Sequence, residues 1–229
     1  MRNLLAFTVL FASLFQSDIA SAQGPGLIKY VPPMRGAPQS RIGGGSRGSS
    51  DDIAMLQVLA PDHTGLTTEE QPVLYWYVSK PSRAHFEITV INDQEVEPLV
   101  DRDVDLRVEA GIQRIRLADF GVKLKRGLEY RWYVSLVVDP AQRSNDIVAS
   151  GTIERVEPST ELAGKLAHAT PADIPGIYAG SGIWYDALDA ISRLVDASPG
   201  SRALREERAA LLDEAGLKEA AATERRQAN

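Results

Sequence analysis

The acidic residues show the most regular chemical spacing in the sequence. Asp101, Asp103 and Asp105 alternate along the chain, with Glu95 and Glu97 just upstream. An EF-hand that opened in this way would need glycine at loop position six and glutamate at position twelve, and this chain has leucine and isoleucine there. On a strand the three aspartates would share one face, where their repulsion favours a bound cation such as calcium. The alternative, which we favour, is a solvated face balanced by nearby arginines.

Other patterns for catalysis are weaker. His63, His85 and His168 lie far apart, and the sequence has no Gly-x-Ser-x-Gly elbow, HExxH helix or nucleotide-binding glycine motif. Nothing in the spacing of the 31 acidic residues selects a carboxylate pair for glycoside hydrolysis. We therefore expect no enzymatic activity, cofactor or metal, with an unrecognised hydrolase as an alternative.

Composition removes further classes. The 229 residues include no cysteine, so disulfides, thiolate zinc sites and cysteine nucleophiles are excluded. A net charge of −6 argues against a nucleic-acid partner. The hydrophobic fraction of 44% is that of a folded chain.

The first 22 residues have the pattern of a secretory signal peptide. Arg2 precedes an apolar run over residues 4–15, and Ala20 and Ala22 supply small side chains before the expected cleavage site. The run is about 12 residues long, against the ~20 that a stable transmembrane helix needs. We expect a secreted or periplasmic protein with no membrane span after cleavage near Ala22.

The mature chain divides by composition into four parts. Residues 23–50 form a basic linker rich in glycine and proline, which buries too little apolar surface to offset its ordering entropy. Residues 51–157 are rich in short strands, and residues 158–217 have helical periodicity that indicates a helical hairpin packed on the strands. Residues 218–229 form a polar tail.

The strand-rich part predicts an α+β protein in which an immunoglobulin- or fibronectin-like antiparallel β-sandwich precedes the hairpin. Between Leu124 and Tyr130 the chain reads L-x-x-G-x-x-Y, as in a tyrosine corner, where the ring enters the core and its hydroxyl bonds upstream backbone. The expected strands cover residues 53–59, 73–78, 86–91, 104–108, 112–117, 130–138 and 147–156.

Alternation along these strands separates a core from a candidate binding surface. Residues expected in the core are Trp76, Tyr130, Trp132 and, from the helical stripe, Trp184. Residues expected on the opposite face are Tyr75, Tyr77, Arg131 and Tyr133. If their strands are neighbours, the three tyrosines form an aromatic strip suited to a partner or a sugar ring. The alternative, which we favour, is that the carboxy-terminal helices cover the strip as a second core.

Three segments carry a resemblance to a known family. Residues 66–77 read LTTEEQPVLYWY and residues 182–188 read GIWYDAL, and a glycine- and arginine-rich stretch covers residues 41–48. Together they resemble an uncharacterised bacterial family of secreted proteins, catalogued as domain of unknown function 928. The resemblance implies extracytoplasmic placement and carries no assigned activity.

These observations lead to one function and two alternatives. We expect a non-enzymatic extracytoplasmic module that recognises another protein of the bacterial envelope. The first alternative is a module that binds a glycan or small ligand through the aromatic strip, and the second is the unrecognised hydrolase.

Overall fold

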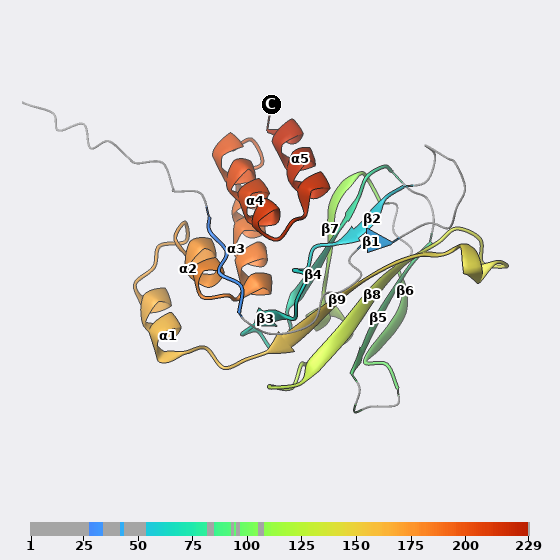
Figure 1. Cartoon of the computed structure of the whole chain (residues 1–229), viewed down its shortest axis with the longest axis horizontal. Helices are drawn as coiled ribbons and strands as arrows, with labels where there is room; N and C mark the ends of the chain where they lie inside the picture. Colours follow the sequence, from blue (N-terminus) through green and yellow to red (C-terminus); the bar gives the residue numbers. More distant parts are fainter. Residues whose placement is uncertain are drawn as a thin grey trace, which may run out of the picture.

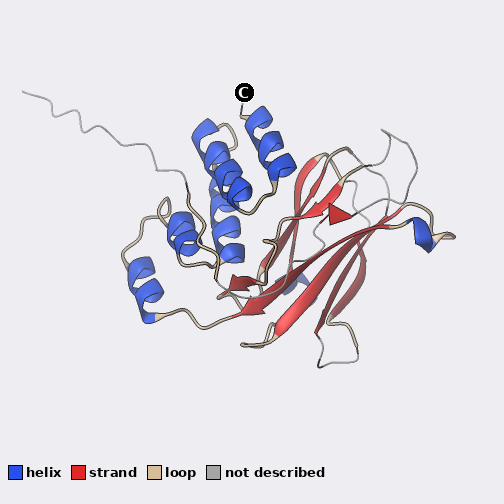
Figure 2. Cartoon of the chain, viewed as in Figure 1, coloured by secondary structure: helices blue, strands red, loops and turns tan. Residues whose placement is uncertain are grey.

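The computed structural model describes residues 28–33, 42–43, 54–81, 85–92, 94, 97–104 and 108–228, without side-chain placement at 42–43 and 102–104. The predicted signal peptide and most of the predicted linker lie outside these residues. Two sheets and five helices make up the described part, which confirms the α+β class (Figure 1, Figure 2). No helix within it is long and apolar enough to cross a bilayer.

The first sheet has four strands in the order β1-β2-β4-β7, and the second has five in the order β3-β9-β8-β5-β6. Every pairing between these strands is antiparallel except that of β3 with β9. The strands are β1 Ile42–Gly43, β2 Leu56–Val58, β3 Gly65–Thr67, β4 Val73–Val78, β5 His85–Asn92, β6 Val100–Val104, β7 Gly111–Arg116, β8 Glu129–Val137 and β9 Ile147–Arg155.

The strand prediction was right for most of the chain and wrong at three places, the first being β1 at Ile42–Gly43, which pairs with β2 and lies inside the segment predicted to be a linker. The strand expected at 104–108 is β6 at Val100–Val104, where its backbone pairs with β5 as a sheet edge. Strand β3 was missed, because three residues are too few to show alternation. The sheets do not close on each other, so the immunoglobulin-like arrangement stays a prediction.

The interior of the sheets is a core of aromatic and aliphatic side chains. Trp76 on β4 and Tyr130 and Trp132 on β8 are almost completely buried in it. The Tyr130 hydroxyl accepts a hydrogen bond from the backbone N–H of Lys125 at 2.9 Å, the bond expected of a tyrosine corner. This bond attaches the chain just before β8 to Tyr130, the first buried residue of that strand.

Five helices follow the strands (Figure 1); among them α3 contacts β3 and β4, and α5 contacts β7. Helix α3 has its buried stripe at Trp184, Leu188, Ile191 and Val195, a spacing of three to four residues. The helices are α1 Thr160–Ala167, α2 Ile174–Gly180, α3 Trp184–Ala197, α4 Arg202–Glu214 and α5 Lys218–Gln227.

The predicted polar tail is instead helix α5. Ala220 and Ala221 are buried, and the buried Glu224 accepts hydrogen bonds from Arg208 of α4, the shorter at 2.6 Å. The helix was not predicted because the apolar side of α5 consists of alanines, which add little to a hydrophobic stripe. Alanine nevertheless has the highest helix propensity, so the segment forms a helix readily.

Part of the predicted linker is also packed. Ile28 and Tyr30 are buried, and the Val31 N–H donates to the carbonyl of Ala179 in α2 at 3.1 Å. The Tyr30 ring meets the Trp184 ring edge-on at 5.1 Å. Residues 28–33 therefore form a strap over the end of α2 and the start of α3.

Candidate functional site

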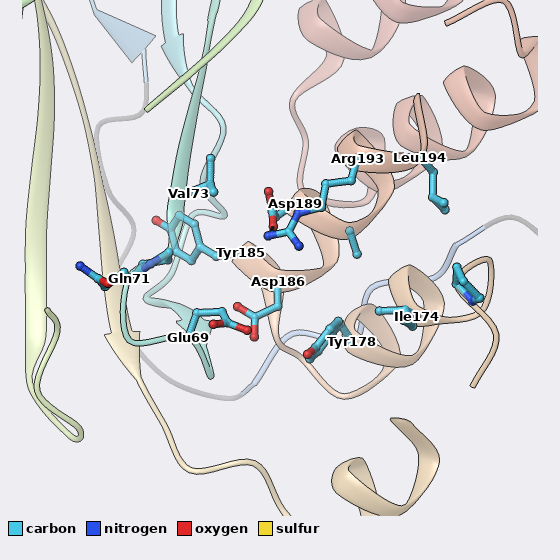
Figure 3. A pocket seen from close by; sticks show the side chains of 13 residues that line it. Glu69, Gln71, Val73, Ile174, Tyr178, Tyr185, Asp186, Asp189, Arg193 and Leu194 are labelled. Atoms are coloured by element: carbon cyan, nitrogen blue, oxygen red, sulfur yellow. Dashed lines mark ion pairs between the residues drawn. The ribbon is translucent and has the colours of Figure 1, made fainter. Parts of the chain in front are cut away.

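A cavity of about 310 Å³ opens between α2, α3 and the chain that joins β3 to β4 (Figure 3). Its walls combine apolar side chains with three carboxylates and one guanidinium. The lining residues are Glu69, Gln71, Pro72, Val73, Pro171, Ile174, Tyr178, Tyr185, Asp186, Asp189, Ala190, Arg193 and Leu194.

The cavity is built where two of the segments that carry the family resemblance, residues 66–77 and 182–188, meet. Asp186, from the second segment, accepts hydrogen bonds from the Thr67 hydroxyl at 2.5 Å, the Thr68 N–H at 2.9 Å and the Thr68 hydroxyl. These bonds attach α3 to the end of β3. Sequence segments more than 100 residues apart thus form one wall.

The electrostatics of Asp186 follow from its position. The residue is only 6% exposed, and burial raises the pKa of its carboxyl to about 6, against the lowering effect of the threonine hydrogen bonds. The nearby Glu69 carboxylate adds a smaller increase to that pKa. Glu69 itself is exposed at the cavity rim. The cavity therefore has one carboxylate in contact with solvent and one that is buried.

Asp189 lies one turn further along α3 and connects the cavity to the sheet. It accepts a hydrogen bond from the Tyr75 hydroxyl at 2.8 Å and forms an ion pair with Arg193 at 2.5 Å. Burial, followed by the Asp189 carboxylate, strongly raises the pKa of Tyr75. The tyrosine therefore stays neutral and acts as a fixed donor.

A second hollow of about 510 Å³ adjoins the cavity and has the opposite charge balance. Arg114 and Arg116 of β7 line it together with Arg193, and Arg114 is paired with Asp196. The two hollows share four lining residues: Gln71, Val73, Asp189 and Arg193. We call the cavity and this hollow together the groove.

The aromatic strip expected from the sequence is not formed. Tyr75 and Tyr77 lie on β4 in the four-stranded sheet, whereas Tyr133 and Arg131 lie on β8 in the five-stranded sheet. Tyr75 and Tyr77 are 1% and 3% exposed, because helices cover that face. The Tyr77 hydroxyl lies 2.9 Å from the Thr223 hydroxyl of α5, which is part of this cover.

The two residues on β8 remain half-exposed. We favoured the alternative in which the carboxy-terminal helices cover all three tyrosines. That prediction is right for Tyr75 and Tyr77 and wrong for Tyr133. A ligand site based on the three tyrosines is excluded by this separation.

The four residues expected in the core are buried and most of their polar atoms are paired. The Trp184 indole donates to the Leu59 carbonyl at 2.8 Å. The Trp132 indole donates to the Tyr185 hydroxyl at 2.9 Å, which donates in turn to the Thr152 carbonyl. The Trp76 indole N–H has no partner among the described residues.

The other candidates from the sequence do not converge. Asp101 is exposed on β6, the Asp103 side chain and all of Asp105 lie outside the described residues, as does Glu95, and Glu97 is exposed in the preceding loop. Within the described ranges no three metal-ligating side chains cluster.

The three histidines occupy separate places. His63 lies within 2.9 Å of the Tyr30 hydroxyl and 3.2 Å of Asp62. His85 begins β5 and His168 follows α1, so neither joins it.

A family model described as Domain of Unknown Function (DUF928) matches residues 42–225. The chain belongs to this family. Both walls of the groove fall inside the DUF928 match, and the family carries no activity that would assign the site a role.

The remaining comparisons add no function. No curated protein matches the chain. One solved structure, a multi-domain immunophilin from Arabidopsis thaliana, is similar over 86% of this chain and 99% of that chain at 9% identity. Its TM-score of 0.18 is too low to support any argument.

Sequence reasoning missed the groove, although one signal was present. Asp186, Asp189 and Arg193 follow one another at intervals of three and four residues, which places them on one face of α3. From the sequence, this helix was interpreted only through the apolar stripe on its other side. Their partners, Thr67 and Thr68, could not be found because they are distant in sequence.

Proposed function

We propose that this DUF928 protein is a non-enzymatic recognition module of the bacterial envelope that binds a partner protein through the groove. The observation that carries the proposal is the continuous lining of the cavity and the hollow, in which apolar walls lie between opposite charges. Concave surfaces with apolar walls and few convergent polar groups are the usual form of small-ligand sites, and grooves of a partner-binding protein dock peptide segments through similar apolar and polar contacts.

The groove is also held rigid, as a recognition surface requires. Asp186 and Asp189 attach α3 to β3 and β4 through hydrogen bonds, and Trp184 anchors the beginning of α3 to Leu59. A preformed surface loses little entropy when a partner binds, which favours affinity.

Site-specific photo-crosslinking tests this function. A benzophenone amino acid at Ile174, a half-buried lining residue, is compared with the same group at Val148, which is 43% exposed on β9. We expect a saturable crosslink to one envelope protein from position 174 only, competed by the unmodified protein. Equal labelling from both positions, or none from 174, contradicts recognition at the groove.

The extracytoplasmic location is part of the proposal and is tested separately. The apolar run and small residues before Gln23 support cleavage by a signal peptidase. Cell fractionation followed by amino-terminal sequencing should find a chain that begins at Gln23 in the envelope or medium. A cytoplasmic chain that retains Met1 contradicts it.

We also propose that the two sheets follow an immunoglobulin-like plan. The tyrosine-corner bond of Tyr130 and the parallel pairing of β3 with β9 at a sheet edge support this. An experimental structure that showed a different strand order would contradict it.

Hydrolysis is the second candidate function, because Glu69 and Asp186 bring two carboxylates to one cavity and the Asp186 pKa is raised to about 6. A screen with chromogenic glycoside and ester substrates tests it. Activity abolished by both Glu69→Gln and Asp186→Asn would support catalysis, and activity that survives both would contradict it.

A further inference from the structure

The charges of the groove are sorted by end. The cavity has the carboxylates of Glu69, Asp186 and Asp189 against the single guanidinium of Arg193. The hollow has the guanidiniums of Arg114, Arg116 and Arg193 against the carboxylates of Asp189 and Asp196. One end is therefore net acidic and the other net basic.

Internal ion pairs neutralise four of these charges and leave one exposed charge unpaired at each end, while among the described residues the buried Asp186 carboxylate is held by threonine hydrogen bonds alone. Asp189 pairs with Arg193, and Asp196 with Arg114. Glu69 at the cavity rim and Arg116 in the hollow are both exposed, and neither has an ion pair among the described residues. An incoming group thus meets an unpaired carboxylate at one end and an unpaired guanidinium at the other.

The wall near the acidic end fits the stem of a long cationic side chain. Val73, Ile174 and Leu194 line the cavity with apolar surface, and Glu69 and Asp186 supply carboxylates beside it. Lysine and arginine bury their methylenes against such surface while the charged end reaches a polar partner.

The basic end fits an acidic side chain. Arg116 presents a planar guanidinium, which binds carboxylates through two parallel hydrogen bonds. Since the two hollows share Gln71, Val73, Asp189 and Arg193, one extended ligand can occupy both.

We propose that the occupant of the groove is an extended polypeptide segment that places a lysine or arginine side chain in the cavity and an aspartate or glutamate side chain in the hollow. The proposal rests on the recognition function proposed above and defines its ligand. Charge complementarity argues for it, because nucleic acids and anionic glycans supply the anion but not the cation.

Selection from a displayed library of random 12-residue peptides tests the ligand class with the full mature chain. We expect enriched peptides to contain a basic and an acidic residue in a fixed order and spacing. Glu69→Lys should remove the preference for the basic residue, and Arg116→Glu the preference for the acidic one. Each substitution should weaken binding of an enriched peptide, measured by fluorescence anisotropy, about tenfold.

Matched controls reverse charge away from the groove. Glu109→Lys lies before β7 and Arg202→Glu begins α4, and both side chains are exposed. Neither should alter the selected pattern, and circular dichroism verifies folding of all four variants.

Three results overturn the inference. They are enriched peptides without the charge pair, preferences that survive both groove substitutions, and a library without any enriched peptide. If position 174 still crosslinks to a protein in any of these cases, the recognition function stands and only the ligand class is wrong. If that crosslink is absent as well, both proposals fall.

Discussion

The outer faces of the two sheets differ, although both sheets share one interior. All six residues of β4 are buried, whereas β5 alternates between buried and half-buried residues along its length. The sequences already differ in this way, since β4 reads VLYWYV and β5 reads HFEITVIN. An uninterrupted apolar strand needs cover on both faces, and helices α3 and α5 supply it.

The covered face is also where the groove is built. Tyr75 and Tyr133 are both outward tyrosines, but the Tyr75 hydroxyl bonds Asp189 of α3 and Tyr133 stays half-exposed. The second layer of packing thus turns this face of β4 into one wall of the groove, while the face of β8 that holds Tyr133 stays partly open to solvent. Four substitutions test this contrast.

Trp184→Ala should give the largest effect, because it removes the ring that seats α3 against Leu59 and Tyr30. Loss of a buried tryptophan costs about 3–5 kcal/mol of unfolding free energy. Urea denaturation measures it, with Trp184→Phe as a control that restores part of the packing. A cost below about 1 kcal/mol would show that the helical layer does not depend on this ring.

Asp186→Asn should remove a dependence of stability on pH. The folded-state pKa of about 6 lies above the unfolded value, so the folded chain takes up the proton first as pH falls. The free energy of unfolding should therefore increase as the pH is lowered from 7 to 4, by about 1.4 kcal/mol for each unit by which the folded pKa exceeds the unfolded one.

The Asp186→Asn variant should lose this increase at low pH. Its free energy of unfolding should also be lower by about 2 kcal/mol, because the hydrogen bonds from Thr67 and Thr68 are disturbed. Urea midpoints between pH 4 and 7 measure both effects. Asp119→Asn, at an exposed position, is the control and should keep the wild-type pH profile. An unchanged slope in Asp186→Asn would mean that another group titrates.

Tyr75→Phe should cost about 1 kcal/mol, because it deletes the hydroxyl that donates to Asp189 and keeps the buried ring. Thermal unfolding of the variant measures it. Asp189 keeps its ion pair with Arg193, so a much larger loss would indicate that the tyrosine positions α3 as a whole.

Tyr133→Thr should give the smallest effect, within about 0.5 kcal/mol, because a half-exposed strand position accepts a β-branched residue. The same unfolding experiment measures it. A cost as large as that of Trp184→Ala would mean that the outer face of the second sheet is covered too, and the contrast between the sheets would be lost.

The sequence supports prediction wherever a local period decides the structure. The strand at 73–78, the core rings of β8, the bond of Tyr130 and the buried stripe of α3 all follow from spacing alone. The family assignment followed from short motifs in the same way.

Prediction failed wherever the deciding contact was distant in sequence. Which sheet holds Tyr133 depends on strand order, and the groove depends on Thr68 meeting Asp186 across 118 residues. Helix α5 packs through buried alanines and the ion pair between Glu224 and Arg208, and neither contact is indicated by charge composition or by a hydrophobic stripe.

The strap at residues 28–33 links the order of folding to the order of synthesis. Tyr30 is among the first described residues, yet its ring packs on Trp184, about 150 residues later in the chain. The contact cannot form until the helical region exists, so one of the earliest segments made is among the last to find its place. Until then the Tyr30 ring and the Trp184 surface that it covers stay open to water, and exposed apolar surface of this kind favours aggregation.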